Sequence, residues 1–212
     1  YLDFYFDHIT AVFSVLGAFI TFLVAIFSSF YLHRDEGYKR FFNTLLLFYF
    51  GYNVVVFSGN FETLFIGWEF LGITSFLLIA FYRDRYLPVQ NALKTISHYR
   101  VGDVCLILAL WMSHHLWHEN ITFVKLNHLD LVVAHIQEHY YFVLFIILML
   151  VIAAAIKSAQ IPFSSWLPRA MEGPTTSSAV FYGSLSVHLG VFLLLRTYPY
   201  WETIGVAKIF II

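Results

Sequence analysis

Six long apolar segments divide the chain and decide what it can fold into. Each is long enough to cross the hydrocarbon core of a bilayer as a helix. They cover residues 9–32, 42–59, 63–82, 101–117, 140–159 and 174–197. Their apolar residues occupy every face instead of alternating, which favours helices over the strands of a membrane barrel. The sequence therefore predicts an all-α polytopic membrane protein, with about six transmembrane helices in a single transmembrane domain over residues 1–212.

Composition supports a membrane protein and excludes several other classes. Hydrophobic residues make up 60% of the chain and charged residues 12%, with a mean hydropathy of +0.74, as in proteins that cross a membrane repeatedly. A net charge of −1 without a basic run argues against a nucleic-acid partner. The single cysteine, Cys105, excludes an internal disulfide and a multi-cysteine metal site. The chain begins at Tyr1 without a basic region before its first apolar segment, so we expect a truncated chain instead of a signal peptide.

Basic residues in the connections predict the orientation in the membrane. They prefer the cytoplasmic or matrix side, and one side of the predicted bundle holds eight against three on the other. The first side holds Arg34, Lys39, Arg40, Arg83, Arg85, Lys94, Arg100 and Arg169, and the second holds Lys125, Arg196 and Lys208. We therefore predict that the first side faces the cytoplasm or matrix.

Three stretches lie outside the six segments or overlap their ends. Residues 87–99 have apolar positions at helical spacing, which predicts either a short helix or an extension of the fourth segment. Residues 113–139 are polar and rich in histidine, so we predict an exposed loop. Residues 206–212 resemble the start of a seventh helix.

Lys157 ends a run of fifteen uncharged residues, 142–156. A charge at this depth is costly and marks a functional site by default. Pro162 follows closely and has no backbone N–H, so we predict a broken helix near Lys157 and Pro162. Irregular backbone inside a membrane needs protein or a wet cavity around it. The alternative is an ordinary lysine at a helix end that reaches the interface.

Glu69 is the only carboxylate well inside its predicted span. An ionised carboxylate in hydrocarbon needs a cation or water beside it, and otherwise it holds a proton. Either state makes the residue responsive to protons. The alternative is a carboxylate near a helix end that reaches the lipid headgroups.

Three motifs resemble subunit 5 of NADH:ubiquinone oxidoreductase, respiratory complex I, in the antiporter-like family. KSAQIPFSSWLPRAMEGPTTSSA, residues 157–179, is similar to the family's K-S-A-Q-x-P-x-x-x-W-L-x-x-A-M-x-G-P-T-P-V-S-A. GWEFLG, residues 67–72, is similar to G-W-E-G-V-G, and RVGD stands at 100–103. The resemblance implies two five-helix repeats of inverted topology, each with a broken helix. This chain would hold most of the first repeat.

The resemblance also implies roles for charged residues. Glu69 aligns with the family's essential intramembrane glutamate and Lys157 with its broken-helix lysine. Arg100 and Asp103 align with groups that modulate this pair, and Lys94 with an upstream lysine. Arg100 and Asp103 are also three residues apart, so they can pair on one helix face.

The residues that would pass a proton onward from Lys157 depart from the family pattern. The pattern S-A-L-I-H-A-A-T-M places a histidine where this chain has Tyr182, which can hold water or a hydrogen bond. His188 titrates near neutral pH and can relay a proton, although a lone helical histidine is more often a packing residue. It lies six residues further on, on a different helix face.

The other histidines do not make a convincing metal site. His114 and His118, like His135 and His139, stand four residues apart, a spacing that can hold zinc on a helix. No acidic partner completes an H-E-x-x-H motif, which favours a solvated loop. We also find no phosphate-binding or dinucleotide motif. We expect no metal and no cofactor in this chain, with NADH, FMN, iron–sulfur clusters and ubiquinone held by partner subunits.

The resemblance implies a proton-translocating membrane-arm subunit of NADH:ubiquinone oxidoreductase, which moves protons through Glu/Lys pairs while quinone is reduced elsewhere. The chain would be part of an enzyme without carrying a redox centre. Its partners would be the bilayer, other membrane-arm subunits, especially an adjacent antiporter-like subunit, and the missing second half as further sequence or a separate chain. The mitochondrial inner membrane is the expected location, with a bacterial plasma membrane as the alternative. Two other functions stay open: a subunit of a multisubunit cation/proton antiporter, and a non-pumping structural fragment.

Overall fold

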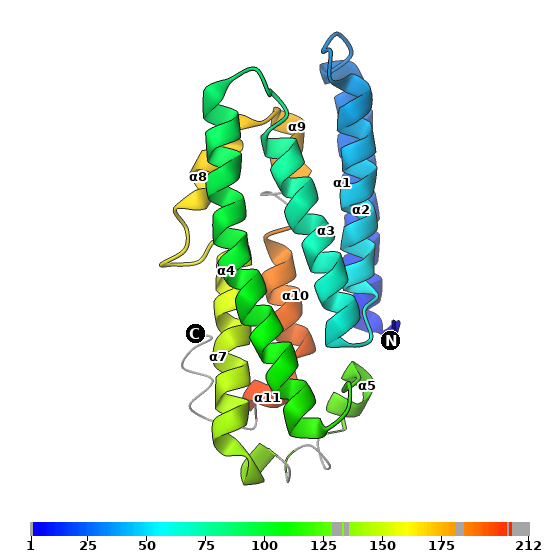
Figure 1. Ribbon diagram of the computed structural model, residues 1–212. Coiled ribbons are helices and arrows are strands. Elements are labelled where there is room, and N and C mark those ends of the chain that lie inside the picture. Colours follow the sequence, from blue (N-terminus) through cyan, green and yellow to red (C-terminus); the bar gives the residue numbers. More distant parts are fainter. Residues whose placement is uncertain (1, 129–132, 134–135, 181–184, 203, 205–212) are drawn as a thin grey trace.

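The computed structural model is a bundle of long helices running roughly along one axis (Figure 1). It describes residues 2–128, 133, 136–180, 185–202 and 204. Within these residues the backbone is mostly helical. The β-structure described there consists of two isolated β-bridges, one between Phe4 and Ser58 and one between Asn60 and Thr122. The predicted all-α fold is confirmed. Six helices, α1 (His8–Tyr31), α2 (Tyr38–Val56), α3 (Phe61–Ile79), α4 (Tyr86–Trp117), α7 (Tyr140–Lys157) and α10 (His188–Arg196), each pack against the next one in this order.

The first three helices match the predicted segments closely. They are α1 (His8–Tyr31), α2 (Tyr38–Val56) and α3 (Phe61–Ile79). The Asp7 side chain accepts a bond from the Thr10 N–H at the start of α1, and Asn60 accepts one from Thr63 at the start of α3. Such caps satisfy N–H groups that have no partner within a helix.

The α1 helix has the residue distribution of a membrane helix. Its buried residues are small or polar, Thr10, Gly17, Thr21 and Ser28, while large apolar side chains such as Phe19 and Phe22 point outward. Small residues let helix backbones approach closely, and the apolar outer face suits lipid. By length and composition, α1, α3 and α7 (Tyr140–Lys157) each meet the requirements for crossing a membrane.

The fourth helix is longer than the predicted segment 101–117. α4 runs over Tyr86–Trp117, so residues 87–99 extend this helix, one of the two predicted possibilities. Asn91, Ala92, Thr95 and Tyr99 repeat at helical spacing and are buried, which gives the extension an inward face. Pro88 lies in the first turn, where a missing N–H breaks no helical bond. At 32 residues the helix is about 48 Å long.

The predicted exposed loop at 113–139 is partly wrong. Its first residues belong to α4, and a short helix, α5 (Phe123–Leu126), follows. Phe123 and Leu126 are buried, and the Phe123 ring meets the Phe61 ring edge to face at 5.1 Å. The burial of these two side chains and the hydrogen bond from the Phe123 N–H to the Gly59 carbonyl hold this segment against the bundle.

The predicted single helix over 174–197 is not continuous in the described part of this range, and residues 181–184 lie outside that part. Two short helices are described there, α9 (Thr175–Ser178) and α10 (His188–Arg196), and residues 185–187 before α10 are not helical. Between them the Leu185 N–H bonds to the Val180 carbonyl, one residue further back than in an α-helix. The chain between α7 and α9 forms α8 (Trp166–Arg169) and a 3₁₀ turn, η1 (Ala170–Glu172), and α11 (Tyr198–Glu202) follows α10. The predicted seventh helix at 206–212 lies outside the described residues.

Candidate functional site

Lys157 is the last residue of α7, and the backbone turns away directly after it. Ala159 has a left-handed backbone conformation with φ of 52°. The Gln160 N–H donates to the Ala155 carbonyl at 2.9 Å, and the Ala159 N–H to the Ile156 carbonyl at 3.3 Å. This pair of bonds is a common way for a helix to end. The predicted break is therefore present, and it precedes Pro162 by several residues.

The end of α7 is also held from the opposite side. The Ser158 hydroxyl donates to the Val187 carbonyl at 2.8 Å, just before α10. Gly190 of α10 lies so close that an added Cβ would be 2.0 Å from Ser158 Oγ and 2.6 Å from the Ala154 carbonyl oxygen. The broken end of α7 thus packs against the start of α10 without space for a side chain.

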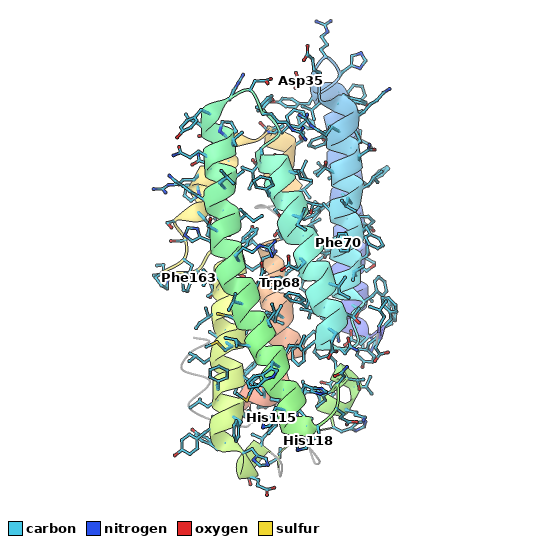
Figure 2. All side chains as sticks on the ribbon, in the orientation of Figure 1. Asp35, Trp68, Phe70, His115, His118 and Phe163 are labelled. Carbon is cyan, nitrogen blue, oxygen red and sulfur yellow. The ribbon has the colours of Figure 1, made fainter. Side chains whose placement is uncertain are left out.

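The Lys157 side chain is buried and its ammonium has no ordinary hydrogen bond. Only 2% of the residue is exposed, and Nζ has no hydrogen-bond partner among the described residues. Two aromatic ring faces lie close to it: Nζ is 4.5 Å from the Tyr99 ring centre and 4.9 Å from that of Trp68. Figure 2 shows Trp68 on the side of α3 towards α4, while Phe70 points away towards α2.

Glu69 pairs with Arg100 in this structure. Arg100 Nη1 lies 2.9 Å from Glu69 Oε1 and 2.8 Å from Oε2. The same nitrogen lies 3.5 Å from Asp103 Oδ2, so the predicted pairing of Arg100 with Asp103 is present as well. The Arg100 side chain is 50% exposed, Glu69 23% and Asp103 8%. The cluster therefore opens towards the outer face of the bundle at Arg100.

Lys157 remains within electrostatic reach of this cluster. Glu69, Asp103 and Arg100 all interact with its charge. Four charged groups from α3, α4 and α7 thus lie together, three of them bonded to one another and the fourth enclosed by aromatic rings.

Two of the remaining predicted residues are exposed, and one lies outside the described residues. Lys94 is exposed on the extended part of α4, and its carbonyl contacts the His98 ring at 2.8 Å. His188 is exposed at the start of α10. Tyr182 lies outside the described residues.

Three of the histidines near the end of α4 lie around one cavity. His115, His118 and His139 line a cavity of about 100 Å³ together with Leu116 and Phe142, and the rings of His115 and His118 are 6.1 Å apart (Figure 2). In the described part of the chain, no group of three or more histidine, cysteine or acidic residues has a metal-binding arrangement. His135 lies outside it.

Sequence reasoning missed two sets of residues. Trp68 and Tyr99 stand directly before Glu69 and Arg100, a placement that offers a signal only once both helices are oriented. Arg196, assigned to a loop by charge counting, is buried and pairs with Asp7 at 2.7 Å and 3.2 Å. It also bonds to Thr10, so α10 is tied to the start of α1.

Comparisons with known proteins point to one family over most of the chain. Residues 58–212 match the family described as NADH:quinone oxidoreductase/Mrp antiporter, TM. Residues 1–42 match the family described as NADH-ubiquinone oxidoreductase (complex I), chain 5 N-terminus. The two matches together leave out only residues 43–57.

Relatives and solved structures agree with this match. NADH-ubiquinone oxidoreductase chain 5 of Phoca vitulina is 38% identical over 202 residues, covering 95% of this chain and 31% of the relative. That of Sus scrofa is 37% identical over 205 residues, with 95% and 32% covered. The chain thus spans about a third of the length of the curated relatives it matches.

Two solved structures have a similar fold. A chain of the Mrp complex from Dietzia sp. DQ12-45-1b is 28% identical, with a TM-score of 0.84, and 96% of this chain and 22% of that one are covered. A chain of an archaeal respiratory membrane complex, the membrane-bound sulfane sulfur reductase, is 17% identical with a TM-score of 0.81, covering 98% and 41%. At that identity the second likeness concerns the fold alone.

Proposed function

Because the chain belongs to the NADH:quinone oxidoreductase/Mrp antiporter family, we propose that it is a proton-translocating membrane-arm part of NADH:ubiquinone oxidoreductase. One observation carries this proposal: the buried ammonium of Lys157 is within electrostatic reach of a Glu69–Arg100 pair in a bundle of apolar helices. Charged groups inside a membrane are costly and are kept where ions or protons move. Glu69 and Lys157 are the proposed proton-exchanging residues.

The proposed mechanism is an exchange of ion-pair partners. In the state described here Arg100 holds Glu69. When the carboxylate of Glu69 or Asp103 turns to Lys157, the new ion pair stabilises the charged ammonium. When that ion pair breaks again, the ammonium loses this stabilisation and releases its proton more readily. At 4 Å and an effective dielectric constant near 20, such an interaction is about 4 kcal/mol, or about a thousandfold in proton binding. The side chains of one small cluster are therefore sufficient to take up and release protons.

Arg100 and Asp103 tune this exchange in our proposal. Arg100 competes with Lys157 for Glu69, and Asp103 is bonded to Arg100 and interacts with Lys157. Tyr182 and His188 remain proposed relay residues towards the rest of the protein. Lys94 is proposed only as a distant modulator, since it lies exposed on α4.

The electron-transfer chemistry is assigned to partner subunits. A single cysteine cannot ligate an iron–sulfur cluster alone, and we propose that NADH oxidation and quinone reduction take place in partner subunits of the complex. The Arg100 side chain is half exposed although it pairs with Glu69 and Asp103, which supports contact with further protein. An adjacent antiporter-like subunit and the remainder of a longer chain are the proposed partners, in the inner mitochondrial membrane.

A second function is a cation/proton antiporter subunit. The likeness to the Mrp complex of Dietzia favours it specifically, since the TM-score is 0.84 at 28% identity. The curated relatives named as complex I chains are more similar in sequence, at 38%. A sodium requirement for proton movement would favour the antiporter.

The test replaces Glu69 with glutamine in membranes that hold the assembled complex. We expect NADH-driven proton uptake to fall by roughly tenfold or more, because a proton-exchanging carboxylate is lost. Glu119→Gln is the matched control, since its carboxylate is exposed and pairs only with exposed Lys125. If Glu69→Gln assembles normally and pumps like the wild type, the chain is better described as a structural part of the membrane arm.

A further inference from the structure

Two aromatic rings face the ammonium of Lys157 in place of a carboxylate. Nζ lies 4.5 Å from the Tyr99 ring centre and 4.9 Å from the Trp68 ring centre, within the range of cation–π attraction. We propose that Trp68 and Tyr99 form an aromatic cage, which holds the charged Lys157 while Glu69 is bonded to Arg100. In this view the two aromatic residues are positioning residues for proton exchange.

The cage and the ion pair are built from adjacent residues on the same two helices. Trp68 precedes Glu69 on α3, and Tyr99 precedes Arg100 on α4. Successive helical residues point about 100° apart, so the aromatic side chains turn inward while the charged ones lie nearer the outer face. Trp68 and Tyr99 are both buried, and Arg100 is half exposed. The same helix rotation thus sets the ion pair and the cage together.

A third aromatic residue fixes the Tyr99 side of the cage. The Trp166 ring meets the Tyr99 ring edge to face, with centres 5.0 Å apart and planes at 76°. Its Nε1 donates to the Ile156 carbonyl at 3.0 Å, one residue before Lys157. The Tyr99 ring is therefore anchored to the helix that carries the ammonium.

An aromatic cage differs chemically from a carboxylate partner. A ring face attracts the ammonium but has no basic oxygen to accept its proton, so it stabilises the charged form without competing for the proton. The titratable or charged groups that act on Lys157 are Glu69 from α3 and Tyr99, Arg100 and Asp103 from α4. Since Arg100 pairs with both carboxylates, the rings add an attraction at direct contact to the longer-range attraction of Glu69 and Asp103 for Lys157.

The Tyr99 hydroxyl allows the ring to be tested separately from hydrogen bonding. This hydroxyl lies near the side chains of Ser186 and Ser75 and has no ordinary hydrogen bond to a described residue. Tyr99→Phe removes the hydroxyl and keeps the ring face, whereas Tyr99→Leu removes the ring. If the cage is correct, Tyr99→Leu should change the protonation of Lys157 and Tyr99→Phe should not.

The first experiment measures the charge of Lys157 without relying on pumping. A short pulse of acetic anhydride is applied to the assembled complex over a range of pH, and acetylation of Lys157 is measured by mass spectrometry, because only the neutral amine reacts. We expect Tyr99→Leu to lower the pH midpoint of labelling by about one unit, the size of a desolvated cation–π contact. Tyr99→Phe should leave the midpoint unchanged, and exposed Lys125 is the internal control in every sample.

Trp68 provides a second, graded test. Trp68→Phe keeps a weaker ring face and should shift the midpoint in the same direction by less than Trp68→Leu. It also keeps most of the buried volume, so it remains informative if the leucine variants fail to assemble. Unchanged midpoints in both Tyr99→Leu and Trp68→Phe would overturn the cage, as would equal shifts in Tyr99→Phe and Tyr99→Leu.

The role in proton exchange rests on the proposed function and is tested alongside it. In the same variants the alkaline limb of NADH-driven proton uptake should move to lower pH by about one unit, with about a tenfold loss at a fixed alkaline pH. If the labelling midpoints shift but Lys157→Met still pumps normally, the cage stands and the proposed function fails. If Lys157→Met abolishes pumping while the leucine variants leave labelling and the pH profile unchanged, the proposed function stands and the cage is overturned.

Discussion

Ala159 is the residue that ends the helix of Lys157, although alanine is an unusual choice there. Its left-handed φ of 52° places a Cβ close to the following carbonyl oxygen, which costs about 1–2 kcal/mol relative to an ordinary conformation. Glycine has no such cost. The backbone bonds of Ala159 and Gln160 back to α7 hold this conformation in place.

Ala159→Gly should therefore stabilise the protein by about 1 kcal/mol, since the turn is kept and the Cβ contact is removed. Ala155→Gly is the matched control, because Ala155 lies inside α7 and glycine there should destabilise by a similar amount. Thermal unfolding of the purified complex measures both. A lower midpoint for Ala159→Gly than for the wild type would show that the turn does not depend on this conformation.

At the scale of residues, the sequence identifies charges better than their partners. Glu69 and Lys157 are recognisable because each is an isolated charge in an apolar stretch. Their partners depend on how α3, α4 and α7 are rotated against one another, which spacing along one helix does not contain. For this reason the sequence predicted the Arg100–Asp103 pair, which lies on one helix, whereas the Arg100–Glu69 bond between two helices and the contacts of Trp68 and Tyr99 were not predicted.

At the scale of elements, the extent of helices was harder to predict than their existence. Charges at Lys94 and Arg100 placed a boundary at residue 101, whereas α4 begins at Tyr86 because one face of residues 91–99 is buried. Apolar composition predicted one helix over 174–197, but hydropathy contains no information on where a chain turns between packed neighbours. The close approach of Gly190 to Ser158 holds α10 in its separate position.

The Asp7–Arg196 pair joins two distant elements, α1 and α10. The Arg196 side chain is 2% exposed, so removing the carboxylate leaves a buried charge without its partner. We expect Asp7→Asn to destabilise the protein by about 3 kcal/mol at neutral pH, measured as a lower thermal unfolding midpoint. Asp35→Asn in the exposed turn between α1 and α2 is the control.

The loss of stability in Asp7→Asn should also depend on pH, and it should be smaller at acidic pH. Burial raises the pKa of Asp7, but the bonds from Thr10 and Arg196 outweigh it, so the pKa lies below the ordinary 3.8. A carboxylate with a lowered pKa contributes stability that is present above its unfolded value and is lost as the pH falls through its folded value. The difference between wild type and Asp7→Asn should therefore be full at neutral pH and shrink below about pH 4. A constant difference down to lower pH would show that the carboxylate charge contributes little.

At the scale of the whole molecule, the connections of α1 with α2 and of α3 with α4 meet at one end. The Arg40 guanidinium in α2 donates to the Phe81 carbonyl after α3 at 2.7 Å, and both connections line one cavity of about 440 Å³. The α5 helix lies at the opposite end of the bundle (Figure 1). Arg34, Arg83 and Arg85 lie in these two connections, and Lys39 and Arg40 lie in the first turn of α2. This end is predicted to face the matrix or cytoplasm.

The native cysteine content makes this orientation directly testable. Cys105 is buried, so a membrane-impermeant maleimide should give little background. We expect Asp35→Cys to react only from the matrix or cytoplasmic side and Asn127→Cys, exposed after α5, only from the other. Reversed labelling would mean that the basic residues do not set the orientation. Labelling of both from one side would contradict the crossing of the bundle, because α4 joins the two ends through a single helix about 48 Å long.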